Sequence, residues 1–235
     1  MDKIQYMKSL INGKLYEQQI WNICKNIKFN NKIFCTMKKN KLGYDHDIIC
    51  NNVKKNDLFI EIKKYNAPDW MQLSIRPDNV GIWRSGGKNK IPEKSKQLIE
   101  NIIKNINIFN SNIPPFFNKN ITHEEWKTIK KNTSDFNDIY IPCPNNTISQ
   151  LYKNKRCSYI QISNYGLYHL GKDICNFNVP YFNCKQVLRI RTKIHKRCNN
   201  NGFMCASVII SPKPFIIIKS NYSLDNYQKL PINLK

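Results

Sequence analysis

The chain has 235 residues, of which 41% are hydrophobic, and this composition favours a packed protein over a disordered one. Its 38 Lys and Arg residues oppose 16 Asp and Glu residues, so the formal net charge is +22. Such an excess indicates a polyanionic partner, and nucleic acid is the first candidate. The alternative is that an AT-rich genome raises the Lys content of a chain that is also crowded with Asn and Ile.

The sequence carries no sign of a membrane or secreted protein. No apolar run approaches the length of a membrane span, and no apolar stretch follows the N-terminal lysines as in a signal peptide. The nine cysteines are scattered, odd in number and without a Cys-x-x-Cys pair. We therefore expect a soluble, intracellular protein with reduced thiols.

The first third of the chain predicts one helix followed by short strands. Residues 1–30 have apolar positions at helical spacing, and Glu17 borders that apolar face, where it could point inward or be an ordinary solvated glutamate. The period then changes, and turn-rich links separate four short apolar stretches. The expected strands cover residues 33–37, 44–50, 58–64 and 70–75. A helix followed by a mainly antiparallel meander is typical of an α+β fold.

Two charged residues stand out on the expected strand within Asp57–Tyr65. Side chains two apart on a strand share a face, so Glu61 and Lys63 project together from an otherwise apolar stretch. Such charges are costly unless they are paired, solvated or bound to a metal. Asp47 lies on the preceding strand, and the three groups would suit a hard divalent cation and an activated water. The alternative is an ion pair on a solvent-facing strand edge.

A Gly-rich basic loop follows over residues 76–91, and Arg84 and Lys88 in it are expected to contact DNA. Gln72, which precedes this loop, could point into the cleft of the charged residues and contact a base. Trp70 is expected to pack in the core.

Two further helices are expected in the middle of the chain. One begins near Pro92 and runs to about residue 109. The other begins after Thr122, which forms a capping box with Glu125. The chain has a second Glu-x-Lys sequence at Glu125–Lys127. Because Glu125 already belongs to the capping box, we interpret this second copy as unrelated to a site.

From Ile139 onward, short strands predict a β-rich region, and its most informative segment is Val187–Arg197. Leu188 and Ile190 share one face of this expected strand, and the opposite face is basic. The basic residues are Arg189, Arg191, Lys193 and His195. Such a face suits a phosphate backbone, and arginine can read guanine edges. The alternative is an edge strand protected by charge.

Asp47, a turn, and Glu61-Ile62-Lys63 on an apolar strand resemble the motif of the PD-(D/E)xK nuclease superfamily, which includes type II restriction endonucleases. A helix that bears Glu17 ahead of the strands is also similar to the order in this family. The resemblance implies a restriction-endonuclease-like mixed sheet flanked by helices. It further implies Asp47, Glu61 and the Ile62 carbonyl as magnesium ligands, Lys63 as the catalytic lysine and Glu17 as an accessory acid.

The sequence departs from the family motif at one point. His46, and not proline, precedes Asp47, and Asp45 is also available, so either aspartate could be the ligand.

Together these features predict a catalytic core over residues 1–135 and a β-rich basic region over residues 136–235 that recognises DNA, unless the two form one continuous domain. The expected function is magnesium-dependent, sequence-specific hydrolysis of double-stranded DNA, and the resemblance implies a homodimer. The alternatives are a non-catalytic nucleic-acid-binding protein and a structure-specific repair or recombination nuclease.

Overall fold

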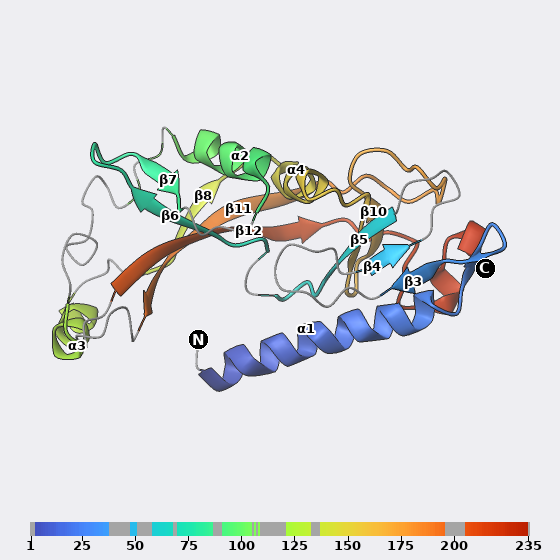
Figure 1. The fold of residues 1–235 in the computed structure, drawn as a ribbon, viewed down its shortest axis with the longest axis horizontal. Coiled ribbons are helices and arrows are strands. Elements are labelled where there is room, and N and C mark those ends of the chain that lie inside the picture. Colours follow the sequence, from blue (N-terminus) through green and yellow to red (C-terminus); the bar gives the residue numbers. More distant parts are fainter. Residues whose placement is uncertain are drawn as a thin grey trace. The chain divides into compact units, whose positions relative to one another are not determined.

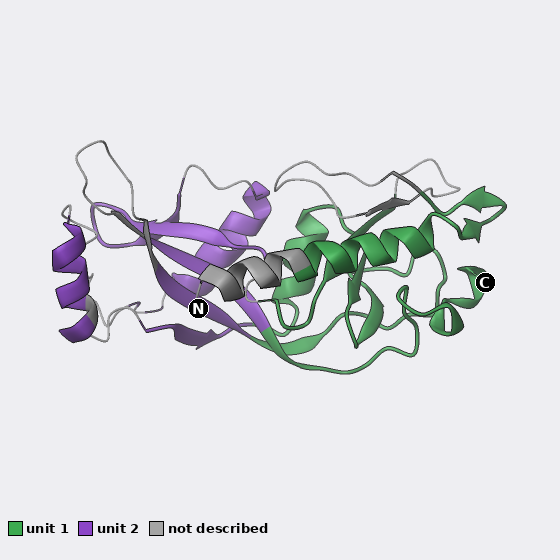
Figure 2. Cartoon of the chain, turned by 90° about the horizontal axis from the view of Figure 1, so that it is seen from below, with its two compact units in different colours: residues 1–70, 144–186, 214–235 green, residues 71–143, 187–213 purple. Residues whose placement is uncertain are grey.

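A computed structural model describes residues 3–37, 48–50, 58–67, 70–86, 91–104, 106, 108, 121–132, 137–195 and 205–234. The chain forms two compact units (Figure 2). Unit 1 comprises residues 1–70, 144–186 and 214–235, and unit 2 comprises residues 71–143 and 187–213. The units therefore do not follow a boundary at residue 135, because each is assembled from separate segments of the chain. A DNA-recognition role for residues 136–235 stays a prediction.

Unit 1 is built on a mixed sheet with the strand order β10-β9-β5-β4-β3 (Figure 1). The strands are β3 (Cys35–Met37), β4 (Ile48–Cys50), β5 (Leu58–Lys63), β9 (Tyr159–Ile162) and β10 (Gly166–His169). Neighbouring strands β3, β4 and β5 pair antiparallel, as the sequence predicts for a meander. Strand β9 pairs parallel to β5 and antiparallel to β10, so a strand from far along the chain completes the sheet around β5.

The two faces of β5 meet different helices. One face packs against α1 (Lys3–Cys24), so the helix expected over residues 1–30 is present but ends at Cys24, and residues 28–29 are instead in a strand. Buried members of this core include Leu58, Ile60 and Ile62 of β5 with Tyr16, Ile20 and Cys24 of α1. Side chains alternate along a strand, so Glu61 and Lys63 project from the other face. The α4 helix (Thr147–Asn154) lies on that side, opposite α1 (Figure 1).

Short elements complete unit 1. They are the hairpin strands β1 (Lys28–Phe29) and β2 (Lys32–Ile33) and the 3-10 helices η3 (Tyr227–Lys229) and η4 (Ile232–Leu234). Asn30 and Asn31 connect the hairpin with φ angles of 50° and 64°, the left-handed conformation that a two-residue turn requires. Phe29 packs edge-on against Phe34 and Phe177, with ring centroids 6.0 and 5.5 Å away, so the hairpin is anchored in the core.

A second sheet has the strand order β7-β6-β12-β11-β8, and it belongs to unit 2 except for residues 184–186 of β11 and 214–217 of β12, which belong to unit 1. Its strands are β6 (Leu73–Pro77), β7 (Trp83–Ser85), β8 (Ile139–Pro142), β11 (Cys184–His195) and β12 (Cys205–Ile217). The pairs β6–β7, β6–β12 and β8–β11 are antiparallel. Leu188 and Ile190 of β11 are buried, which confirms the apolar face predicted for this strand.

Two helices belong to unit 2. The α2 helix (Glu93–Ile103) begins after Pro92 as expected, but it ends well before residue 109. The expected end was therefore wrong, and Lys104 is the C-cap of the helix. The α3 helix (His123–Asn132) has the predicted capping box: the Glu125 amide donates to Thr122 Oγ1 at 3.2 Å, and Glu125 Oε2 accepts from the Thr122 amide at 2.7 Å.

Other elements also differ from the sequence expectation. The strand expected over residues 70–75 is β6 (Leu73–Pro77), which pairs with β7 and β12 in the second sheet and does not continue the meander. The α4 helix was not predicted, although Ile148, Leu151 and Tyr152 have the spacing of a helical apolar stripe and are buried. Strand β12 joins two expected strands and continues through Pro212 and Pro214, which lie beyond the residues that pair with β6.

The described part of the chain is an α+β protein, as the sequence predicts. Among its described helices, no candidate for a membrane span was found.

Candidate active site

The Glu61 carboxylate is buried between two ammonium groups. Glu61 is 1% exposed and lies in the middle of the unit 1 sheet. Its Oε1 is 2.6 Å from Lys63 Nζ, and its Oε2 is 2.8 Å from Lys155 Nζ. An ion pair between Glu61 and Lys63, the alternative weighed for this motif, is therefore present, but on a buried central strand instead of a solvent-facing edge, and with a second lysine that was not predicted.

Lys155 reaches the carboxylate because of how α4 ends. The amide of Cys157 donates to the Tyr152 carbonyl at 3.0 Å, and the amide of Arg156 donates to the Lys153 carbonyl at 2.8 Å. These two bonds form a Schellman motif, in which Arg156 adopts the left-handed conformation with φ of 69°. The motif turns the chain at Arg156, three residues before β9 begins beside β5.

Tyr152 and Cys157 line the charged cluster. The Tyr152 ring centroid is 5.6 Å from Lys63 Nζ and 5.9 Å from Lys155 Nζ, which allows cation–π attraction with both ammonium groups. The Cys157 thiol donates to Glu61 Oε2 over 3.7 Å. The Glu61 side chain is 2% exposed, whereas Lys63 and Lys155 keep 19% and 14% of their side chains exposed.

The electrostatics of the cluster keep Glu61 ionised. Burial alone would raise the pKa of this carboxyl, because a low dielectric disfavours the charged form. Lys63 and Lys155 oppose this through charge and hydrogen bonds, and they hold the pKa at about 2, below the ordinary value of 4.5. Carboxyls with strongly shifted pKa values gather at functional sites, although structural ion pairs also shift them.

The described residues do not by themselves fit a magnesium ion. They offer one carboxylate, Glu61, whose charge the two lysines already exceed. Among the residues that the structure describes, no group of three or more His, Cys, Asp or Glu side chains could hold a metal. Magnesium usually takes oxygen ligands from one or two carboxylates, so the predicted site depends on a further acid.

That further acid, Asp47, lies outside the described residues, as do its alternative Asp45, the preceding His46 and the loop residue Lys88. The described register pairs Ile48 with Ile60, and these residues directly follow Asp47 and directly precede Glu61 in the sequence. The assignment of the aspartate stays a prediction.

Two other expected participants lie on or against β5. Ile62 is buried beside Gln161 of β9, and its side chain belongs to the core that faces α1. Glu17 is half-buried on α1, which covers the face of β5 opposite Glu61. The ligand role of the Ile62 carbonyl and the accessory role of Glu17 stay predictions.

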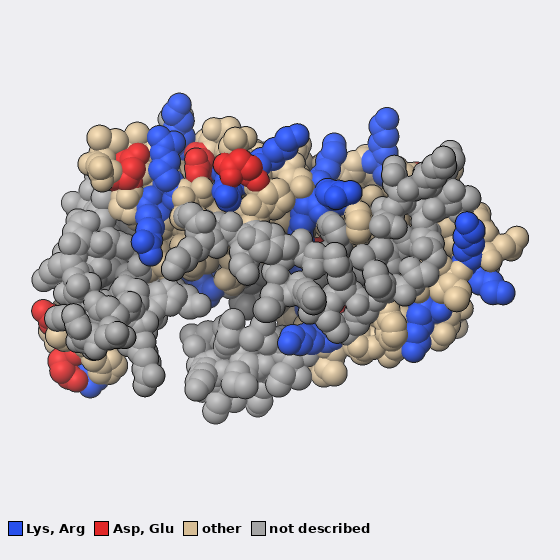
Figure 3. Space-filling view, in the orientation of Figure 1, with Lys and Arg blue, Asp and Glu red and all other residues tan. Residues whose placement is uncertain are grey.

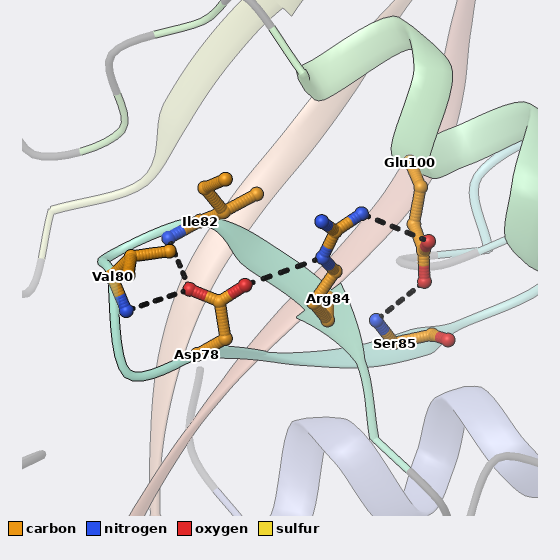
Figure 4. Close-up of polar contacts among 6 residues, drawn as sticks. All are labelled: Asp78, Val80, Ile82, Arg84, Ser85 and Glu100. Atoms are coloured by element: carbon orange, nitrogen blue, oxygen red, sulfur yellow. Dashed lines mark hydrogen bonds and ion pairs between the residues drawn. The ribbon is translucent and has the colours of Figure 1, made fainter.

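Arg84, an expected DNA contact, is engaged with acids in unit 2 (Figure 4). Its Nε is 3.4 Å from Asp78 Oδ2, and its Nη1 is 4.0 Å from Glu100 Oε2. Asp78 Oδ1 also accepts from the amides of Val80 and Ile82, which closes the β6–β7 turn. Arg84 therefore braces the hairpin, and a phosphate would have to compete with two carboxylates for it.

The basic residues of β11 are also partly engaged. Arg189 donates from Nε and Nη2 to Asp138 Oδ2, at 2.7 and 2.6 Å. Arg191 is half-buried on the same face of the strand. For Lys193 and His195, the structure gives the backbone in β11 but not the side chains. DNA contact by this face stays a prediction, and Asp138 would have to release Arg189.

Trp70 and Gln72 precede β6, and they differ in burial. Trp70 is 1% exposed and stacks on Phe182, with ring centroids 6.3 Å apart, which confirms its expected packing role. Gln72 is exposed directly before β6 in unit 2. Its proposed contact with a base stays a prediction.

Comparison with protein families, curated proteins and solved structures found no match to this chain.

Proposed function

We propose that the chain is a nuclease that hydrolyses phosphodiester bonds of double-stranded DNA at Glu61 and Lys63. The observation that carries this proposal is the ionised Glu61 carboxylate, buried between two ammonium groups on a central strand. Replacing a buried ion pair by apolar residues often leaves stability unchanged or higher, so stability alone explains this cluster poorly. The mixed sheet and the helix ahead of it agree with the resemblance to the PD-(D/E)xK nucleases.

The two lysines have different roles in the proposed reaction. Lys63 Nζ faces the substrate phosphate, where it orients the attacking water and offsets the negative charge that develops in the transition state. Glu61 holds this ammonium group in position through the 2.6 Å ion pair. Lys155 fixes the other oxygen of the same carboxylate, so the carboxylate cannot rotate away.

Magnesium belongs to the proposal as the cofactor that the resemblance implies. When bound, the ion would offset the charge of the phosphate and lower the pKa of a coordinated water. Glu61 would be one protein ligand and Asp47 the second. The requirement for magnesium thus depends on Asp47.

The test compares plasmid cleavage by matched variants. Wild-type protein with magnesium is expected to give discrete DNA fragments, and excess EDTA is expected to prevent them. Glu61→Gln and Lys63→Met should remove cleavage while melting curves show folded protein. The control is Lys127→Met in the second Glu-x-Lys sequence, which lies in capped helix α3 and should cut like wild type.

Each alternative has its own outcome. DNA that is shifted on a gel but stays intact with wild-type protein would contradict the nuclease and support a non-catalytic binding protein. A diffuse smear of DNA fragments would contradict sequence-specific cleavage and support a nonspecific or structure-specific nuclease. Cleavage that survives both Glu61→Gln and Lys63→Met would place the active site elsewhere.

Sequence specificity and dimer formation complete the proposal. A type II restriction-like enzyme would cut both strands with one active site per subunit. Light scattering of the protein with and without a DNA duplex measures the subunit number directly. A monomer in both conditions would remove the dimer from the proposal and leave the active site unaffected.

A further inference from the structure

A small cationic cavity opens beside the end of α4 in unit 1. Its volume is about 210 Å³, and Lys153, Arg156 and Lys172 contribute to its walls. None of the described residues that line it carries a carboxylate. The cavity therefore concentrates positive charge in a space below the size of most small-molecule pockets, which suits a compact anion.

Local structure brings these three cations together. The Schellman motif at the end of α4 fixes Lys153 and Arg156 on the same turn. A Cβ atom placed on Gly171 would lie 3.6 Å from Lys153 Nζ, so this ammonium group rests beside the backbone that precedes Lys172. The guanidinium carbon of Arg156 lies 5.5 Å from the centroid of the Phe59 ring, which supports it by cation–π attraction.

None of the described acids of unit 1 lines this cavity. The described acidic residues of the unit are Glu17, Glu61, Asp173 and Asp225. Asp173 accepts hydrogen bonds from Tyr159 and the Phe177 amide, and Asp225 accepts from Tyr16 and Ser223. On the face drawn in Figure 3, the visible Asp and Glu side chains gather over α2, α3 and the β6–β7 turn, whereas Lys and Arg prevail around α4.

Cys157 links the cavity to the candidate active site. It lines the cavity, and its Sγ is also 3.7 Å from Glu61 Oε2. A single buried side chain thus separates an anion in the cavity from the Glu61 carboxylate.

We infer that this cavity binds a phosphate group of the DNA backbone and thereby positions the neighbouring phosphodiester at Glu61 and Lys63. The inference rests on the proposed function for the identity of the polymer. A second feature supports it: Arg156 occupies a left-handed backbone position with φ of 69°, where glycine is preferred and a side chain adds strain. The strain is understandable if the guanidinium group is needed at this point.

The experiment measures DNA binding in EDTA by the anisotropy of a short fluorescein-labelled duplex, over a range of salt concentrations. The variants are Arg156→Gly, which relieves the backbone strain, and Lys172→Gln. The control is Lys28→Gln on the exposed side of β1, which changes the net charge equally. Each cavity variant is expected to lower the slope of log affinity against log salt by about 0.9, the value for one lost phosphate contact. Lys28→Gln should leave the slope at its wild-type value.

Inorganic phosphate provides the second arm. It should compete with the duplex for the wild-type protein, and less so for Arg156→Gly. Unchanged duplex binding by both cavity variants would overturn the inference. If duplex binding is unchanged but phosphate competes less well against Arg156→Gly, the cavity binds small anions and not the DNA backbone. Plasmid cleavage by the same preparations keeps the two proposals apart. An active wild-type enzyme whose cavity variants bind DNA normally refutes only the cavity. An inactive wild type with cavity-dependent binding refutes the nuclease and the positioning of a scissile phosphodiester, but not the binding of a backbone phosphate by the cavity.

Discussion

Lys155 Nζ lies 2.8 Å from Glu61 Oε2, although 94 residues separate the two in the sequence. The contact joins the end of α4 to the central strand of the unit 1 sheet. Because Lys63 occupies the other carboxylate oxygen, Lys155 is the residue that makes the cluster net positive.

Replacing Lys155 by methionine should destabilise the protein. The change removes a charged hydrogen bond from a buried carboxylate, which typically costs about 2 kcal/mol. The matched control is Lys153→Met on the exposed side of the same helix, for which we expect a change within about 0.5 kcal/mol. Urea unfolding followed by tryptophan fluorescence measures both values. Equal stability of the two variants would mean that the Lys155 contact carries no net energy.

The stability of the protein should depend on pH through Glu61. Its pKa in the folded protein is about 2, below the ordinary value of 4.5, so ionised Glu61 contributes stability above pH 4.5. This contribution is lost as the pH falls from 4.5 towards 2. Urea unfolding between these pH values should show the loss for wild type and a flatter profile for Glu61→Gln. Parallel profiles would contradict the assigned shift.

Two glycines should respond in opposite ways to alanine. A Cβ on Gly166, which has φ of 109°, would lie 2.3 Å from the Tyr222 carbonyl oxygen. Overpacking and backbone strain should together cost about 2 kcal/mol or more. Gly13 lies within α1 with nothing within 4 Å of its added Cβ, so Gly13→Ala should stabilise the protein by roughly 0.5 to 1 kcal/mol. Thermal melting of the two variants checks the sign of each effect.

Arg84 should matter for the hairpin more than for DNA. Asp78 and Glu100 already compensate its charge, so Arg84→Gln should leave the salt dependence of duplex binding unchanged. The variant should lower stability by about 0.5 to 1 kcal/mol, since partly exposed ion pairs contribute modestly. Anisotropy titrations and urea unfolding separate the two effects. If Arg84→Gln lowers the slope of log affinity against log salt, Arg84 contacts a DNA phosphate after all.

Local patterns in the sequence predicted local structure well. The Thr122 capping box, the apolar face of α1 and the alternation in β11 are all present, because each depends on residues a few positions apart. The pairing of Glu61 with Lys63 follows for the same reason, since a strand places alternate side chains on one face.

Long-range relationships could not be predicted in this way. Nothing in the local pattern indicates that β9 pairs parallel to β5, or that Lys155 approaches Glu61. The α4 helix had a detectable signal in Ile148, Leu151 and Tyr152, but its position over the charged face of β5 depends on tertiary packing. The contacts of Arg84 with Glu100 and of Arg189 with Asp138 were likewise not predicted, because these acids lie outside the strands that carry the two arginines.

The parallel pairing of β5 with β9 has a consequence for folding during synthesis. A nascent chain that has emerged only to residue 135 contains Glu61 and Lys63 but lacks α4, Lys155 and β9. Closing such a long loop delays folding, because the entropy of the loop is lost before the contacts form. If the cluster is an active site, a ribosome-bound or prematurely terminated chain would contain Glu61 and Lys63 without Lys155, which completes the cluster. Premature fragments would then be harmless to the DNA of the cell that makes them.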